Sequence, residues 1–183
     1  AKLLGEAMHA VEQGSSFEDV VAAQRAFGFP MDPFVLLDLV GLKVGAHVLD
    51  THHGAFPDRF FESPALHELA AEGVLLEKDG KGEPKGIDKR ARKIVAKHTP
   101  AGAVALSVDE LRLRIEDGLA DEIKRMLETQ VVEAAEDIDL CMILGAGWPF
   151  HMGGITPYLD RVGASERVFG GTFHEPRVAG PKA

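Results

Sequence analysis

The chain has 183 residues, which fits one ordinary domain or two small ones that share a core. A hydrophobic fraction of 45% and a charged fraction of 27% are typical of a globular protein and exclude a disordered or fibrous one. The net charge of −9 argues against a nucleic-acid partner, because such partners require clustered Lys and Arg.

Apolar residues at helical spacing dominate the first half of the chain. Ser16 followed by Asp19 forms a loose capping box, and Ser63-Pro64 begins a helix that Gly73 ends. The Gly- and Lys-rich stretch 77–86 has no apolar period and is predicted to be an exposed loop or linker. Helices are predicted at about 4–11, 16–27, 34–41, 42–52, 64–73 and 87–97.

The strongest helix signal lies in the second half. Ser107 and Glu110 form a capping box, and apolar residues from Val108 to Met126 then mark one face. Further helices are predicted at about 135–144 and 155–162, and the tail 170–183 is predicted to be loose. No segment shows the sustained alternation of a strand, so the predicted fold class is all-α.

An internal repeat organises these helices. The stretch Ala26–Met31 is echoed by Gly145–Phe150, and each follows an acidic helix start and a longer amphipathic helix. Two copies of one helical unit would bury their apolar faces against each other as a pseudo-symmetric bundle. The predicted organisation is a first repeat at 1–76, a linker with a short helix at 77–106, a second repeat at 107–169, and the loose tail at 170–183.

Two Gly-x-Gly sequences do not have the context of a dinucleotide site. Gly145-Ala146-Gly147 follows a helical pattern and is followed by Trp148 and Pro149, so a third glycine is absent and a proline removes an N–H donor. Gly80-Lys81-Gly82 has neither the preceding strand nor the following helix. We therefore predict that neither stretch binds a nucleotide.

The histidines suggest a metal site only at first sight. His52 and His53 are adjacent and would point apart on a helix, and His47 does not share a face with His52. They are interpreted as a polar helix end. His151 could line a pocket beside the Trp148-Pro149-Phe150 bend, but a polar bend residue is the favoured interpretation. No metal site is predicted.

The remaining reactive groups also favour structural interpretations. Cys141 lies in the apolar run 138–144 and is predicted to be a buried structural thiol, and a single cysteine suits a reducing compartment such as the cytoplasm. The carboxylates Glu133, Glu136, Asp137 and Asp139 are interpreted as an acidic helix start rather than an acid–base pair. No signal peptide and no apolar stretch of the roughly 18 residues that a membrane span requires is visible.

The residues Phe27–Gly41 resemble the signature of the C-terminal domain of 3-hydroxyacyl-CoA dehydrogenases. That signature usually reads Gly-Phe-Pro-Met-Gly-Pro-Phe with Leu-Leu-Asp-Leu-Val-Gly after it, and Asp32 stands here where the family commonly has Gly. The stretch 136–154 is similar to the second copy found in the longer, multifunctional chains of fatty-acid β-oxidation. The resemblance covers nearly the whole chain except the tail.

This resemblance implies a part of an NAD-dependent enzyme that oxidises L-3-hydroxyacyl-CoA. In the family, the His–Glu pair and the Gly-rich fingerprint lie in an N-terminal domain, so no catalytic, cofactor-binding or metal-binding residue is assigned here, and NAD is expected in the parent enzyme only. The positions that match the family's acyl-facing bend, and that are predicted to lie near the substrate, are Gly28, Pro30, Met31, Pro33 and Leu37.

Two interpretations of function stay open at this point. In the first, the chain is the substrate-cleft and subunit-contact region of the dehydrogenase and is inactive alone. It would then bind acyl-CoA together with the N-terminal domain. In the second, it is a non-catalytic helical module that dimerises or docks a partner such as the thiolase subunit. The chain begins inside a helical pattern without an N-cap, which predicts that further residues precede Ala1.

Overall fold

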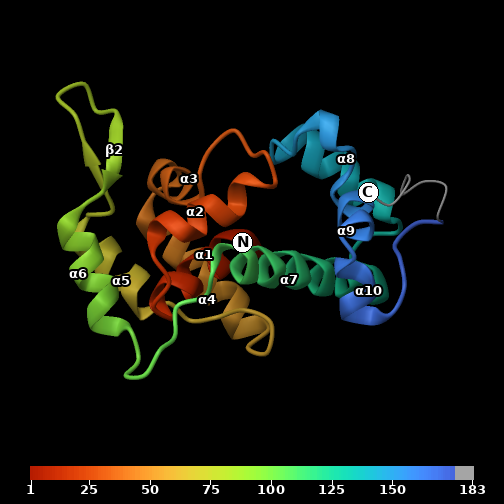
Figure 1. The fold of residues 1–183 in the computed structure, drawn as a ribbon, viewed down its shortest axis with the longest axis horizontal. Coiled ribbons are helices and arrows are strands. Elements are labelled where there is room, and N and C mark those ends of the chain that lie inside the picture. The colour runs from red at the N-terminus through yellow and green to blue at the C-terminus, as the bar shows by residue number, and fades with distance from the viewer. Residues whose placement is uncertain (176–183) are drawn as a thin grey trace. The chain divides into compact units, whose positions relative to one another are not determined.

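The computed structural model describes residues 1–175, which are mainly helical and include one small two-stranded sheet (Figure 1). The all-α prediction is therefore confirmed. The chain forms two compact units: the first holds residues 1–24 and 31–111, and the second holds 25–30 and the residues from Arg112 onward. Among the described residues, no helix is long and apolar enough to cross a membrane.

The first unit is built from short amphipathic helices. Their apolar sides meet in one core, whose fully buried members include Met8, Val20, Leu69 and Leu75. The helices are α1 (Lys2–Glu12), α2 (Phe17–Arg25), α3 (Pro33–Val40), α4 (Leu42–Ala55), α5 (Pro64–Glu72) and α6 (Lys89–His98).

Local capping signals place several of these helices where the sequence predicts them. The Asp19 N–H donates to the Ser16 hydroxyl at 3.0 Å, and the hydroxyl donates back to the Asp19 carboxylate at 2.7 Å. The Leu66 N–H donates to the Ser63 hydroxyl at 3.2 Å, and α5 ends at Gly73 in the left-handed conformation. These helix boundaries are confirmed.

The stretch 77–86 is a β-hairpin, so its prediction as a plain loop was wrong. Strands β1 (Leu76–Lys78) and β2 (Pro84–Ile87) pair antiparallel, and the Asp79 carboxylate orders the turn by accepting N–H bonds from Lys81 and Glu83 at 2.8 and 2.9 Å. Strands of three and four residues are too short to show a period-2 pattern.

The units are divided differently from the predicted repeats. Helix α6, predicted to lie in a linker, contributes Ala91, Ile94 and Val95 to the core of the first unit. The bend 25–30, predicted to lie in the first repeat, belongs to the second unit. The repeat boundaries describe the sequence pattern and stay a prediction.

The longest helix, α7, begins in the first unit, and from Arg112 onward it belongs to the second. The Ser107–Glu110 capping box is confirmed: the Ser107 N–H donates to Glu110 at 2.8 Å, and the Glu110 N–H donates to the Ser107 hydroxyl at 3.3 Å. The six-residue helix α10 was not predicted. The elements are α7 (Val108–Glu128), α8 (Ala135–Gly145), a 3₁₀ turn η1 (Phe150–Met152), α9 (Ile155–Arg161) and α10 (Ala164–Phe169).

The two Gly–aromatic–Pro bends of the repeat meet inside the second unit. A Cβ added to Gly28 would lie 3.0 Å from Pro149 Cγ, and one added to Gly147 would lie 3.5 Å from Pro30 Cγ. Each bend's glycine thus faces the proline of the other. These contacts are reciprocal, although pseudo-symmetry of the whole bundle stays a prediction.

A buried carboxylate links α1 to the start of α5 in the first unit. The Glu12 carboxylate is almost fully buried and accepts a hydrogen bond from the Ser63 hydroxyl and another from the Ala65 N–H. Burial raises the pKa of the Glu12 carboxyl above its ordinary value, and these hydrogen bonds offset part of the rise. The folded state therefore binds the Glu12 proton more tightly than the unfolded state does.

Replacing this carboxylate isolates its pH dependence. The stability that Glu12 contributes is fully present below its unfolded pKa and is lost as pH rises through the higher folded pKa. The free energy of unfolding of the natural protein minus that of Glu12→Gln is therefore expected to fall as pH rises through this window. Urea denaturation at a series of pH values measures the difference, and a difference that grows with pH would contradict the assignment.

Candidate functional site

An apolar hollow of about 210 Å³ lies in the first unit, among α1, α3, α4 and α5. Its lining is mainly apolar, so it can accept an apolar group. The lining residues are Ala1, Leu4, Gly5, Met8, Leu37, Val40, Gly45, Val48, Leu49 and Leu66.

Two glycines allow the helices around the hollow to approach closely. A Cβ at Gly45 would lie 2.4 Å from Leu37 Cδ1, so a side chain at this position would force the Leu37 side chain to move. A Cβ at Gly5 would lie 3.1 Å from Leu49 Cδ1, which makes the approach of α1 to α4 nearly as tight. The shape of the hollow thus depends on residues that have no side chain.

Two of the lining side chains also reach the surface of the first unit. Val40 at the end of α3 and Val48 on α4 both line the hollow and are exposed. The hollow is therefore accessible from solvent at these two residues.

The five residues predicted to lie near a substrate are found in different places. Leu37 lines the hollow, and Pro33 is buried in the first turn of α3. Met31 is exposed at the surface. Gly28 and Pro30 belong to the second unit, where they form the contact between the two bends. Of the five, only Leu37 is among the lining residues, and proximity to a substrate stays a prediction for all of them.

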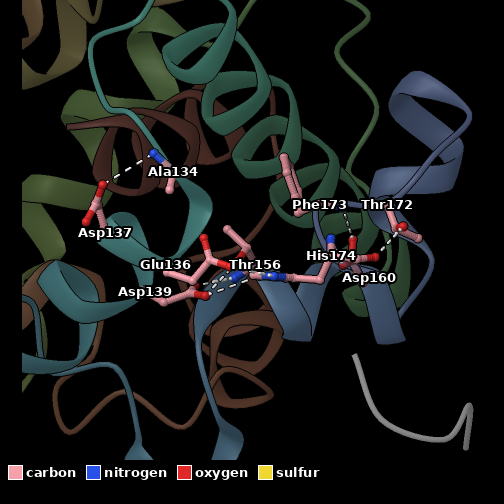
Figure 2. Close-up of polar contacts among 9 residues, drawn as sticks. All are labelled: Ala134, Glu136, Asp137, Asp139, Thr156, Asp160, Thr172, Phe173 and His174. Carbon is pink, nitrogen blue, oxygen red and sulfur yellow. Dashed lines mark hydrogen bonds and ion pairs between the residues drawn. The ribbon is translucent and has the colours of Figure 1, made fainter. Parts of the chain in front are cut away.

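A second cluster, which the sequence did not predict, lies in the second unit (Figure 2). The Thr156 N–H and hydroxyl both donate to the Asp139 carboxylate, at 2.8 and 2.7 Å, and the hydroxyl oxygen lies 2.6 Å from His174 Nε2. His174 is 7% exposed, and its Nδ1 lies 3.5 Å from the Glu136 carboxylate. Because Thr156 and His174 are both buried, the cluster is a structural network rather than a nucleophile and its base.

The start of the predicted loose tail is fixed by the same network. The Asp160 carboxylate accepts N–H bonds from Phe173 and His174, at 2.9 and 3.1 Å (Figure 2). These bonds hold residues 173 and 174 within the predicted loose tail, and residues 176–183 fall outside the described residues. A single histidine beyond a Gly-rich stretch gives no sequence signal of a distant partner, so this anchor could not be found by pattern.

A third polar contact fixes α9 to α7. The Tyr158 hydroxyl donates to the buried Glu116 carboxylate at 2.8 Å, and Arg167 lies 3.3 Å from the same carboxylate. Burial and the neighbouring Glu116 charge raise the pKa of Tyr158 far above its ordinary value, so the phenol stays protonated as a donor. The Tyr158 ring packs 5.8 Å from Phe27, measured between centroids, so this contact also holds the aromatic cluster of the second unit in place.

The part of the chain that matches a known family includes the residues around the hollow. Residues 1–85 match the family model described as 3-hydroxyacyl-CoA dehydrogenase, C-terminal domain. The matched stretch contains every residue that lines the hollow, from α1 to α5.

Most of the chain is also similar to alpha subunits of the fatty acid oxidation complex. The subunit of Acinetobacter baumannii (strain SDF) is 30% identical over 172 residues, which are 86% of this chain and 24% of that protein. The subunit of Psychrobacter sp. (strain PRwf-1) is 31% identical over 166 residues, which are 84% of this chain and 23% of that protein. The chain thus spans about a quarter of the length of these relatives.

Neither Gly-x-Gly pair fits the diphosphate of NAD, the cofactor that the family implies. Gly145 ends α8 and Gly147 has a φ of +74°, so this glycine pair lies at the carbonyl end of a helix, where a phosphate is disfavoured. The other pair, Gly80 and Gly82, lies in the hairpin turn.

The other reactive side chains are placed as follows. Cys141 is exposed, so its prediction as a buried thiol was wrong. His52 and His53 lie in the last turn of α4, where their Nδ1 atoms contact the carbonyl oxygens of Val48 and Phe60 at 2.7 Å. Within residues 1–175, no group of three or more His, Cys, Asp or Glu side chains could hold a metal ion.

Asp32, the departure from the family signature, is the N-cap of α3. Its carboxylate accepts the N–H bonds of Phe34 and Val35, both at 2.9 Å. In the second copy the equivalent helix α9 follows Gly154, which cannot cap, and the remote Asp139 accepts the N–H bond of Thr156 instead. A Cβ at Gly154 would lie 2.2 Å from Asp139 Cγ, so the glycine leaves room for that carboxylate.

The spacing from each bend back to the preceding helix compares Asp139 with Val20. Asp139 precedes Gly147 by eight residues, and the residue eight before Gly28 is Val20. The copy with a carboxylate on the preceding helix has glycine at the N-cap, and the copy with valine there has Asp32. We therefore expect a carboxylate at position 20 to exchange with Asp32 as the acceptor at the start of α3.

This exchange predicts a coupled double substitution. In Val20→Asp alone the new carboxylate is buried, while Asp32 already accepts the N–H bonds at the N-terminus of α3. This substitution is expected to lower the free energy of unfolding by about 3 kcal/mol. Adding Asp32→Gly frees the N–H groups of α3 for the carboxylate introduced on α2. The double variant is therefore expected to have a free energy of unfolding about 1 kcal/mol or more above that of Val20→Asp alone. Urea denaturation of both single variants and the double variant measures the coupling, and strictly additive losses would contradict the exchange.

The His174 anchor can be tested in the same way. His174→Ala removes the contact to Thr156 and is expected to lower the free energy of unfolding by about 1–3 kcal/mol. The exposed neighbour Glu175 provides the matched control, since Glu175→Ala is expected to change stability by less than about 0.5 kcal/mol. Equal effects of the two substitutions in thermal or urea unfolding would show that the network carries little stability.

Proposed function

We propose that this chain is the substrate-cleft and subunit-contact region of an NAD-dependent L-3-hydroxyacyl-CoA dehydrogenase of fatty-acid β-oxidation. In this proposal the apolar hollow of the first unit holds part of the acyl chain, and NAD is bound by another part of the whole protein. The chain by itself has no catalytic residue and no activity. A cytoplasmic location remains part of the proposal.

The observation that carries the proposal is the apolar hollow within the family-matched residues. An acyl chain is a flexible hydrocarbon, and it requires a surface with apolar lining and no unpaired polar group. The hollow has such a lining, and Leu37, which belongs to the family-like signature, forms part of it. The relatives' name, alpha subunit of a fatty acid oxidation complex, agrees with this ligand class.

A second function, a non-catalytic docking module, is supported by a different observation. Helix α8 of the second unit exposes apolar side chains that do not belong to the hollow. The two functions are compatible, because they concern different units of the chain.

Filling the hollow is expected to abolish binding of an acyl chain. We expect octanoyl-CoA, but not free CoA, to shift the methyl signal of Met8, a buried lining residue, in NMR spectra of ¹³C-methyl-methionine protein. Val48→Trp places a large ring at the rim of the hollow and is expected to weaken binding at least about tenfold. Val44→Trp, one turn earlier and outside the lining, is the matched control and is expected to bind normally.

The outcomes of this experiment separate binding from catalysis. Equal shifts with CoA and octanoyl-CoA, or equal binding by both tryptophan variants, would rule out the hollow as an acyl site. In parallel, the pure chain mixed with a 3-hydroxyacyl-CoA and NAD is expected to produce no NADH. NADH formation by the pure chain would contradict the proposal that the chain alone is inactive and that NAD is bound elsewhere in the protein. This outcome does not depend on what the hollow binds.

A further inference from the structure

Helix α8 has an apolar outer face. Ala135 and Ile138 point into the second unit and are buried. Leu140, Cys141 and Leu144 lie on another side of the helix, because residues three, four and seven positions beyond Asp137 share its face. Leu140 is 57% exposed and Leu144 is 76% exposed. These two leucines and Cys141 are called the α8 outer face below.

The sequence around this face is acidic and lacks Lys and Arg. Between Arg125 and Arg161 the chain has neither residue type. The exposed carboxylates Glu133, Glu136 and Asp137 lie at or just before the start of α8. An apolar stripe with carboxylates at one end is therefore presented to solvent by the second unit.

The helix dipole explains only part of this pattern. Acidic residues are favourable at a helix N-terminus, so Glu136 and Asp137 have an ordinary structural role. The dipole gives no reason for two leucines one turn apart to be exposed in the second half of α8, nor for the absence of Lys and Arg. A solvated helix face would normally carry such charged residues there.

We propose that the α8 outer face docks an amphipathic helical segment of another protein, with apolar residues on one side and Lys or Arg beside them. The leucines would receive the partner's apolar residues, and the carboxylates at the start of α8 would attract its cations. A second copy of this chain is a poorer occupant, because each chain carries a net charge of −9 and α8 has no Lys or Arg to attract the carboxylates of another copy. The face is small, so the contact is a transient one.

A pair of designed peptides tests both parts of the proposal. The first is a helix of about 18 residues, built from Leu and Lys with Leu at helical spacing, and the second carries Glu at every Lys position. Fluorescence anisotropy of the labelled peptides is expected to show at least about tenfold tighter binding of the Lys peptide. Leu140→Gln with Leu144→Gln is expected to weaken that binding by about the same factor, whereas the exposed pair Leu39→Gln with Val44→Gln is the matched control in the first unit.

Alkylation of Cys141 shows where the peptide binds. Cys141 is the only cysteine of the chain and lies within the face, so the Lys peptide is expected to slow its reaction with iodoacetamide. Unchanged alkylation in the presence of bound peptide would overturn the proposal, since the peptide would then bind another acidic surface. Equal affinity of the two peptides would overturn the role of charge. Dimerisation in sedimentation that Leu140→Gln with Leu144→Gln abolishes would assign the face to a second copy instead.

Discussion

The structure depends on acceptors for the first N–H groups of short helices. A helix leaves its first four N–H groups without partners, and a terminus packed among other helices cannot rely on water to satisfy them. Helices α3, α5 and α9 have only eight, nine and seven residues, so their termini are a large share of each. Carboxylates supply the acceptors: Asp32 for α3, Glu12 together with Ser63 for α5, and Asp139 for α9.

These caps differ in whether the sequence can reveal them. Ser16, Ser63 and Ser107 act within three residues of themselves, so spacing along the chain was enough to predict their helices. Asp139 acts across 17 residues and Glu12 across 51, and a pattern within one helix contains no information about such partners. For the same reason the anchoring of His174 could not be predicted.

The errors about exposure have a related physical cause. The run 138–144 is apolar on nearly every side of α8, so its periodicity cannot say which side is covered, and Cys141 was placed in the core although it is exposed. The hairpin 76–87 was missed because its strands are only three and four residues long. Family likeness supplied Leu37 as a site residue, but only the structure shows that glycines at 5 and 45 shape the hollow beside it.

The two stretches of the predicted repeat differ in the chemistry of their interiors. The first places Phe34 at the second position of α3, where it is buried in the apolar core. The second places Thr156 at the second position of α9, where it joins Asp139 and His174 in a satisfied polar network. Buried polar networks specify one arrangement, whereas an apolar lining can adapt to a flexible ligand. The first unit is therefore the better suited to hold an acyl chain, and the second is the better suited to present a rigid outer surface such as that of α8.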